Sequence, residues 1–359
     1  MAKTPLVCYA AATEGPALTT HSYSTLMHRL SAAGFKPSVA RRAVLPDWWD
    51  ASCEQNPALL PDIEFRVARF LGAPLALVRD ANVPLISPKY PNAQLRQVRD
   101  IDRDRVGPAI HLALRVAAAT LRNWRGGPAK LDLPPPDPLR WRGLLQQEAE
   151  VIRLRHVLPD LWRRGIPVIH LDKESVPEPR FQGMACIVEG RPVVVLAHSL
   201  DEPGHLAFII AHEVGHIVYG DCEEGRPEVD EDDRNPDDAD AELRANLYSA
   251  RALLGEGVPH LTKGTHQQLA EQASRVEKER RIDAALVARR WGRLAGRAGD
   301  KDAYALATRA VAALGRDKRG KVEIRKAFDE HIDLDAASDT DQALLSCLQG
   351  DPQRDAATP

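Results

Sequence analysis

One apolar segment constrains this chain more than any other feature. Residues 204–219 are apolar enough to form a buried helix, yet they carry His212, Glu213 and His216 in the pattern H-E-x-x-H. Residues four apart on a helix project from the same side, so both imidazoles can bind one metal ion. Burying two histidines and a glutamate is costly unless a metal ion or hydrogen bonds satisfy them. The segment therefore predicts a metal centre, or else a pair of hydrogen-bonded core histidines.

The pattern favours zinc and hydrolytic chemistry. A catalytic zinc site has three protein ligands and one exchangeable water molecule, whose pKa the metal lowers. Glu213, one step around the helix, is positioned to take the proton of that water as a peptide carbonyl is attacked. Two histidines and one carboxylate also accept manganese. We predict one Zn²⁺ per chain, bound by His212 and His216, with Glu213 as the general base.

The third ligand is expected on a second helix, at about 238–254. Glu242 lies there, 26 residues after His216, and the intervening segment is long enough to return the second helix to the first. Spacing alone does not exclude three neighbouring carboxylates, Asp237, Asp238 and Asp240. Asn246, one turn beyond Glu242, is expected either to orient a metal ligand or to cap a helix or pin a loop.

The chain divides into helical blocks around a small α+β unit. The predicted ranges are a helical N-terminal domain at 1–125, a Pro/Gly-rich linker at 126–138, a metallopeptidase domain at 139–256, a helical C-terminal domain at 257–348 and a tail at 349–359. The central range should begin with a helix at 144–164. Strands follow at 166–171, 184–188 and 193–197, with a hairpin turn at 189–192, and the two helices complete the unit. This order predicts an α+β fold that is mostly helical, with a small antiparallel sheet.

In the N-terminal block, Ala68, Gly72 and Val78 have the spacing of a helix-turn-helix. The expected recognition helix offers only Arg79 for contact with a phosphate or a base, so the DNA-binding signal is weak. A degenerate domain that docks a partner is the competing interpretation. A basic region around Arg289 and Arg290 is expected to steer DNA or an acidic partner, to pair with an acidic segment, or to face water.

Bulk composition excludes several classes of protein. The net charge of −3 argues against a general nucleic-acid coat, although residues 221–242 hold twelve acidic residues against two arginines. The five cysteines are scattered and form no C-x-x-C pair, which disfavours a disulfide framework or a cysteine zinc knuckle. The sequence shows no secretion signal and no membrane-spanning apolar stretch, so we expect a cytoplasmic protein without membrane association.

Three motifs together resemble the ImmA/IrrE family of metallopeptidases. They are Gly165-Ile-Pro-Val-Ile, Phe208-Ile-Ile-Ala-His-Glu-Val-Gly-His and Glu242-x-x-Ala-Asn246, in that order, within residues 140–255. The resemblance implies a zincin-like catalytic domain in which His212, His216 and Glu242 bind zinc and Glu213 is the base. The acidic segment and the terminal helical blocks lie outside the family pattern.

The same resemblance implies a biological role. Members of this family make limited cleavages in a partner protein, typically a helix-turn-helix repressor or antitoxin, in the control of stress responses, DNA damage or mobile elements. Two other functions remain to be weighed: a non-enzymatic, zinc-stabilised regulator that binds DNA or a partner, and a peptidase of broad specificity.

Overall fold

The computed structural model describes residues 21–86, 94–95, 106–177, 181–224, 227–230, 239–257, 259–316 and 318–348. This part of the chain is mostly helical and contains one small sheet, which confirms the predicted α+β class. The predicted tail at 349–359 lies outside the described residues. Within the described ranges, no helix has the length and apolar character that a bilayer-spanning segment needs.

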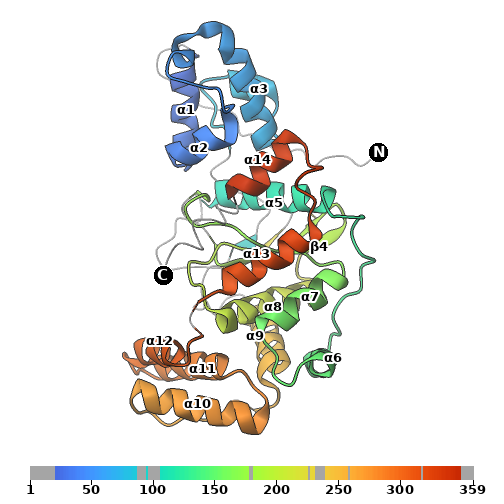
Figure 1. Cartoon of the computed structure of the whole chain (residues 1–359), viewed down its shortest axis with the longest axis vertical. Helices are drawn as coiled ribbons and strands as arrows, with labels where there is room; N and C mark the ends of the chain where they lie inside the picture. Colours follow the sequence, from blue (N-terminus) through green and yellow to red (C-terminus); the bar gives the residue numbers. More distant parts are fainter. Residues whose placement is uncertain are drawn as a thin grey trace.

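The helices account for most of the fold (Figure 1). They are α1 (Tyr23–Ala32), α2 (Pro37–Val44), α3 (Leu60–Leu71), α4 (Leu75–Arg79), α5 (Gly107–Arg122), α6 (Pro138–Glu148), α7 (Leu154–Arg163), α8 (Pro203–Tyr219), α9 (Ala239–Leu254), α10 (His266–Arg280), α11 (Ala284–Arg297), α12 (Ala303–Ala313), α13 (Gly320–His331) and α14 (Asp339–Leu348). Two short 3₁₀ turns, η1 (Cys53–Gln55) and η2 (Pro57–Leu59), precede α3.

The strands form a mixed sheet in the order β1-β5-β3-β4-β2. They are β1 (Gln94–Leu95), β2 (Val168–His170), β3 (Gly183–Val188), β4 (Arg191–Leu196) and β5 (Glu228–Asp230). The predicted β3–β4 hairpin is present, and its turn residues Glu189 and Gly190 have φ of 51° and 74°, as a two-residue type I′ turn requires. The expectation of a purely antiparallel sheet is wrong. The chain crosses over after β2, so β2 runs parallel to β4, and β1 is parallel to β5.

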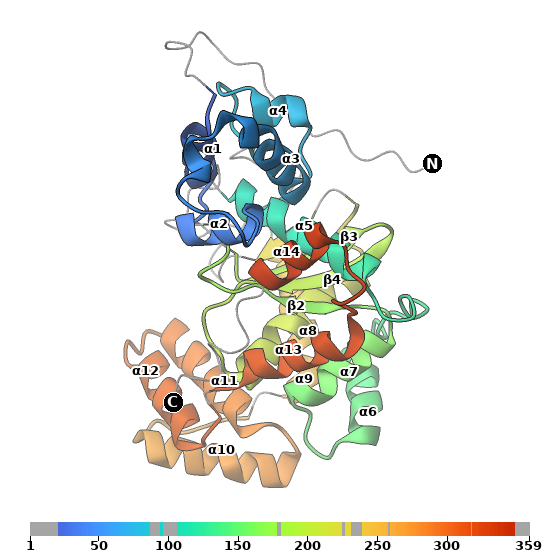
Figure 2. The same ribbon diagram turned by 45° about the horizontal axis from the view of Figure 1, so that its top comes forward.

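The sheet lies between helices. α5 packs against β3 and β4 on one face, and α8 packs against the same two strands on the other (Figure 2). α10, α11 and α12 pack on one another, whereas α13 returns to β2, α7 and α8, and α14 packs on α2, α3 and α5. The last two helices therefore connect the C-terminal part of the chain to the sheet and to the N-terminal helices.

The segment expected as a linker, 126–138, is fixed to the domain that follows it. The Asp132 amide donates to the Arg164 carbonyl, and an Arg191 guanidinium donates to the Ala129 carbonyl. The Asp137 side chain accepts from the Leu139 amide and so caps α6. These hydrogen bonds hold the segment along the surface.

The helix predicted at 144–164 is two helices, α6 and α7. Ala149 is extended, and Arg153 is the N-cap residue of α7. The Arg153 side chain pairs with Glu277 and Asp283 near α10 and α11, and its amide donates to His156. Long-range ion pairs and a local cap thus interrupt a pattern that is helical in sequence.

The N-terminal helices include the predicted helix–turn–helix spacing. Gly72 ends α3 with φ of 64°, and Val78 is fully buried on α4. α4 has only five residues, however, and Arg79 forms an ion pair with Glu64. The one basic residue expected to contact DNA from this helix is therefore already engaged in a salt bridge.

Candidate metal centre

The sequence of α8 accounts for its position and its length. Pro203 occupies the first turn, where a missing amide hydrogen costs nothing, and Gly220 ends the helix in the left-handed conformation, with φ of 73°. Every residue from Leu206 to Ile217 is buried, because the helix has the sheet on one side and α9 on the other. The histidines and glutamate of the motif are therefore held rigidly inside the protein.

Gly215 brings α9 close to α8. A Cβ atom at this position would lie 3.0 Å from the Ala245 Cα and 3.2 Å from the Tyr248 Cβ, both on α9. The glycine inside the H-E-V-G-H motif and the alanine three residues after Glu242 thus permit backbone contact between the helices. This close packing brings Glu242 to the histidines.

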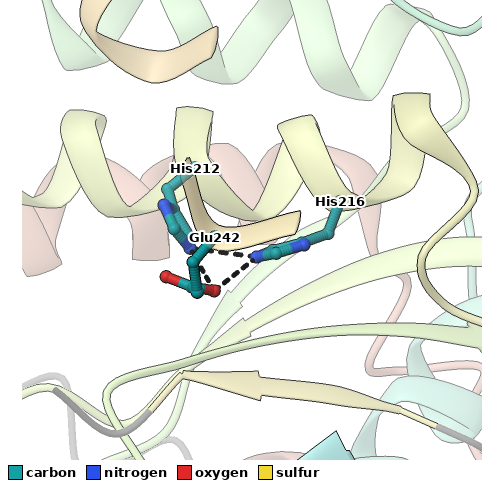
Figure 3. Close-up of side chains that lie close together, drawn as sticks. All are labelled: His212, His216 and Glu242. Atoms are coloured by element: carbon teal, nitrogen blue, oxygen red, sulfur yellow. Dashed lines mark hydrogen bonds and ion pairs between the residues drawn. The ribbon is translucent and has the colours of Figure 1, made fainter. Parts of the chain in front are cut away.

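Three donor atoms converge between the two helices. His212 Nε2 and His216 Nε2 lie 3.0 Å apart, His216 Nε2 lies 3.0 Å from Glu242 Oε1, and His212 Nε2 lies 3.4 Å from the same oxygen (Figure 3). Within the described ranges, these three residues are the only group of three or more His, Cys, Asp or Glu side chains arranged to hold a metal ion. Asp240 is exposed, and Asp237 and Asp238 lie outside the described residues.

The spacing of the donors fits a zinc ion. Ligands about 2.0–2.1 Å from a tetrahedral zinc ion lie about 3.3 Å from one another. The chemistry of the donors points the same way, because two ring nitrogens and a carboxylate oxygen converge on one point. A single proton cannot bridge all three, whereas a cation can, so the residues present suit a metal ion better than a hydrogen-bonded pair of histidines.

Asp221 and Arg244 support His216 from behind. His216 Nδ1 lies 2.9 Å from an Asp221 carboxylate oxygen, and Arg244 donates to the other oxygen over 2.9 Å. Burial acts to lower the pKa of His216, but the hydrogen bonds to Asp221 and Glu242 outweigh it and raise that pKa. With Nδ1 donating to Asp221, the Nε2 lone pair faces the donor cluster. A carboxylate in this position fixes the tautomer and orientation of a metal-binding histidine.

Replacing Asp221 should weaken metal binding without abolishing it. We expect Asp221→Ala to lower zinc affinity about 10- to 100-fold, because His216 loses the carboxylate that orients it. The affinity is measured by competition with a chromophoric chelator. The matched control is Asp240→Ala, which removes the same charge from an exposed position near the cluster. Equal affinities for the two variants would show that Asp221 does not support the metal site.

Glu242 is itself anchored. Asn246 Nδ2 lies 3.4 Å from Glu242 Oε2, one helical turn away, so the amide donates to the oxygen that faces away from the histidines. Burial acts to raise the pKa of Glu242, but hydrogen bonds from His212 and His216 lower it well below its usual range. The carboxylate is therefore ionised, as metal ligation requires.

Glu213 lies on the sheet side of α8. Its side chain is fully buried, and its carboxylate lies against Gly183 at the start of β3. A Cβ atom at position 183 would overlap this carboxylate and would lie 2.8 Å from the Ile209 Cγ2. Position 183 therefore requires glycine because no side chain fits there. Backbone conformation is not the reason, because Gly183 does not have a positive φ.

A methyl group at position 183 should disturb this packing. We expect Gly183→Ala to lower the free energy of unfolding by about 1–3 kcal/mol, because the Glu213 side chain must move within a closed core. Gly143→Ala is the control: Gly143 lies on α6, and a Cβ atom there would meet nothing within 4 Å. In urea unfolding, Gly143→Ala should have the same free energy of unfolding as the wild type or a slightly higher one. Equal stability of Gly183→Ala and wild type would contradict the packing argument.

Four side chains near the motif carry groups that can donate to an oxyanion: those of Tyr219, Tyr248, His198 and His205. The hydroxyls of Tyr219 and Tyr248 donate to the Pro136 and Pro135 carbonyls. His198 and His205 lie beside each other at the start of α8, with their Nε2 atoms 3.4 Å apart. The tyrosines therefore fix the 126–138 segment, and the histidines pair with each other. None of the four is assigned to the reaction.

Two desolvated histidines, buried His170 and half-buried His205, should make stability fall in acid. Burial lowers the pKa of His205 and of His170 to about 3, below the ordinary value near 6.5. The unfolded chain therefore binds these protons first, and stability is lost as pH falls from about 6.5 towards 3, by up to about 1.4 kcal/mol per pH unit for each histidine. We expect His205→Gln to reduce the pH dependence of the urea midpoint between pH 7 and 5. The control His260→Gln, at an exposed position, should leave this pH dependence unchanged. Identical pH dependence in both variants would contradict this account.

Asp221, Gly183 and Gly215 were not identified from the sequence. Asp221 directly follows Gly220, so a signal was available: a carboxylate just past the end of the motif helix is close to its last histidine. Gly215 stands inside the motif itself. Nothing in the sequence connects Gly183 with Glu213, because β3 and α8 meet only through tertiary packing.

Comparison with protein-family models and with curated proteins gives no independent identification. No protein-family model matches the chain, and no curated protein matches it in sequence. Any functional conclusion therefore rests on the residues of the site and on their geometry.

Proposed function

We propose that this chain is a zinc-dependent endopeptidase of the ImmA/IrrE type, with a zincin-like catalytic domain built on α8, α9 and the sheet. The observation that carries the proposal is the convergence of His212, His216 and Glu242, with Glu213 on the same helix as the two histidines. Three protein ligands leave one position open for water and substrate, which distinguishes a catalytic zinc site from a closed structural one.

The reaction follows from the roles that these side chains can fill. Zinc bound here supplies Lewis acidity, which acidifies water and polarises a peptide carbonyl. Glu213 accepts the proton of the attacking water and delivers it to the departing amine. Asp221 and Asn246 keep His216 and Glu242 in position, so that little reorganisation is needed during the reaction.

The burial of the site favours an extended substrate segment. The side chains of His212 and His216 are 4% and 0% exposed, and that of Glu242 is 20% exposed. A peptide bond within a folded element cannot reach such recessed groups, whereas a flexible segment of a partner can. Because the chain resembles the ImmA/IrrE family, we propose that its substrate is a helix-turn-helix repressor or antitoxin. The substrate is cleaved at a limited number of bonds in stress or mobile-element regulation.

The alternative is a non-enzymatic regulator that zinc stabilises and that binds DNA or a partner. The four N-terminal helices are the observation in its favour, because α3 and α4 have helix–turn–helix spacing. The shortness of α4 and the Arg79–Glu64 ion pair weigh against DNA binding. The acidic composition of residues 221–242 and the additional helices favour selectivity over a peptidase of broad specificity.

Cleavage of a defined partner tests the proposal. The zinc-loaded protein is incubated with helix-turn-helix regulators encoded next to it and with a proteome-derived peptide library, and the products are identified by mass spectrometry. We expect one or a few cuts in one regulator and sparse cutting of the library. Extensive cutting of the library would instead indicate broad specificity, and the absence of any cut would favour the non-enzymatic alternative.

A further inference from the structure

A cavity lies away from the metal centre, where α7, α8, α11 and α13 meet. It encloses about 300 Å³, at the lower limit of ligand-binding pockets. The four helices are neighbours in both views of the molecule (Figures 1 and 2). Gly204, which lines this cavity, and His212 are eight residues apart on α8, or about 12 Å along the helix. The cavity and the metal centre are thus separate sites connected by one rigid helix.

Positive charge dominates the lining of this cavity. Two carboxylates line it, Asp283 and Glu323, and a third, Glu277, lies directly behind. The cations that line it are Arg153, Arg155, Arg316, Lys318 and Arg319. Five cations against three carboxylates leave a net positive charge of two, in a chain whose overall charge is −3. The excess is concentrated in a concave site rather than spread over a convex surface, which strengthens its effect on an anion.

Two of the cations are held in place. Arg153 and Arg316 share the same two carboxylates: each donates to Glu277 Oε1, over 2.8 and 2.9 Å, and each lies within 3.2 Å of Asp283 Oδ2. Arg316, from the α12–α13 connection, is thereby fixed beside Arg153 at the start of α7. The pair needs no reordering to receive a ligand, so little conformational entropy is lost on binding.

The other three cations lie at the rim. Arg155, Lys318 and Arg319 are exposed side chains on two segments that face each other across the cavity. The first turn of α8 also lines the cavity with Pro203 and Gly204. Glu202, at the N-cap, pairs with Arg289 rather than capping this helix. The partial positive charge at the end of α8 therefore adds to that of the arginines.

The remaining wall is apolar. It is formed by Ile152, Leu154, Ala207, Leu253, Ala285 and Leu286. An inorganic anion alone would leave this wall uncovered, whereas a ligand with one anionic end and one apolar or ring-shaped end matches both halves of the cavity. A volume near 300 Å³ limits such a ligand to about the size of a mononucleotide.

We propose that this cavity binds a small phosphate ester with a ring-shaped apolar part, of the size of a nucleoside monophosphate. The phosphate contacts the cationic side formed by Arg153, Arg316 and the rim. The ring lies against the wall at Leu154 and Leu286. The bound ligand also contacts α8, the helix that carries the metal ligands, and Leu253 at the end of α9.

Calorimetric titration of the full chain tests this assignment. The probes are AMP, GMP, CMP, UMP, inorganic phosphate and adenosine, each titrated into wild type and into Arg155→Glu/Lys318→Glu. These two positions are exposed, so the double variant should fold normally. Arg309→Glu is the control, a single exposed charge reversal on α12 outside the cavity. Because binding itself is measured, the result does not depend on peptidase activity.

We expect at least one mononucleotide to bind saturably, more tightly than either phosphate or adenosine. Its affinity should fall at least tenfold in Arg155→Glu/Lys318→Glu and should be unchanged in Arg309→Glu. Raising the salt concentration should also weaken it. Failure of all four mononucleotides to bind would overturn the assignment, as would equal affinity in the double variant. Inorganic phosphate binding as tightly as the nucleotides would contradict the role of the apolar wall.

Discussion

Glu213→Gln is expected to reduce peptide-bond cleavage by about a thousandfold, because a positioned general base contributes about 10²–10⁴ to a rate. The amide has the same shape as the carboxylate and fits the same space beside Gly183, but it cannot accept the proton of the attacking water. Zinc content should remain at the wild-type level, since Glu213 is not among the three converging donors. The measurement is the rate of product formation from the cleaved regulator, followed by mass spectrometry.

The pairing of lost activity with retained metal separates the two proposed functions. A non-enzymatic regulator would lose nothing when Glu213 becomes glutamine, and its partner or DNA binding would be unchanged. Glu271→Gln, a change of the same chemistry on α10, serves as the control. Cleavage by Glu213→Gln at the wild-type rate would remove this residue from the reaction.

Glu242→Ala should weaken zinc binding by about a thousandfold, or about 4 kcal/mol at 1.4 kcal/mol per tenfold change. The variant loses one of three ligands and the only negative charge among the converging donors, and it leaves two buried imidazoles facing each other. Competition with a chelator of known affinity measures the change. Asp240→Ala on the same helix is again the control, because its side chain is exposed.

Two outcomes would contradict the role of Glu242. If Asp240→Ala lost as much affinity, the effect would come from helix charge rather than from ligation. If Glu242→Ala kept the wild-type affinity, the third ligand would have to be another carboxylate, and Asp237 or Asp238 would then be the residues to test.

Local patterns accounted for much of the fold. The helical pattern predicted within 257–348 corresponds to α10 through α13, since each of these helices has its own apolar period and its own breakers. The hairpin of β3 and β4 followed from its turn sequence, and α8 ends at a glycine, Gly220, as helices commonly do. The motif spacing likewise indicated which residues of α8 face the cluster.

Features that depend on tertiary packing were missed for a common reason. The break between α6 and α7 is stabilised by Arg153 reaching Glu277 and Asp283, more than a hundred residues away. The parallel pairing of β2 with β4 depends on a crossover that no local pattern encodes. Arg244, which holds the Asp221 carboxylate behind His216, reaches it only once α9 has packed on α8.

The most direct test of the central claim is the metal content of the purified chain, measured by elemental analysis for wild type and His212→Ala after zinc loading and removal of free ion. The account predicts about one zinc ion per wild-type chain and far less in the variant, whose circular dichroism should show the helical content retained. Absence of zinc from the wild type, or equal zinc in both proteins, would contradict a metal centre at His212, His216 and Glu242.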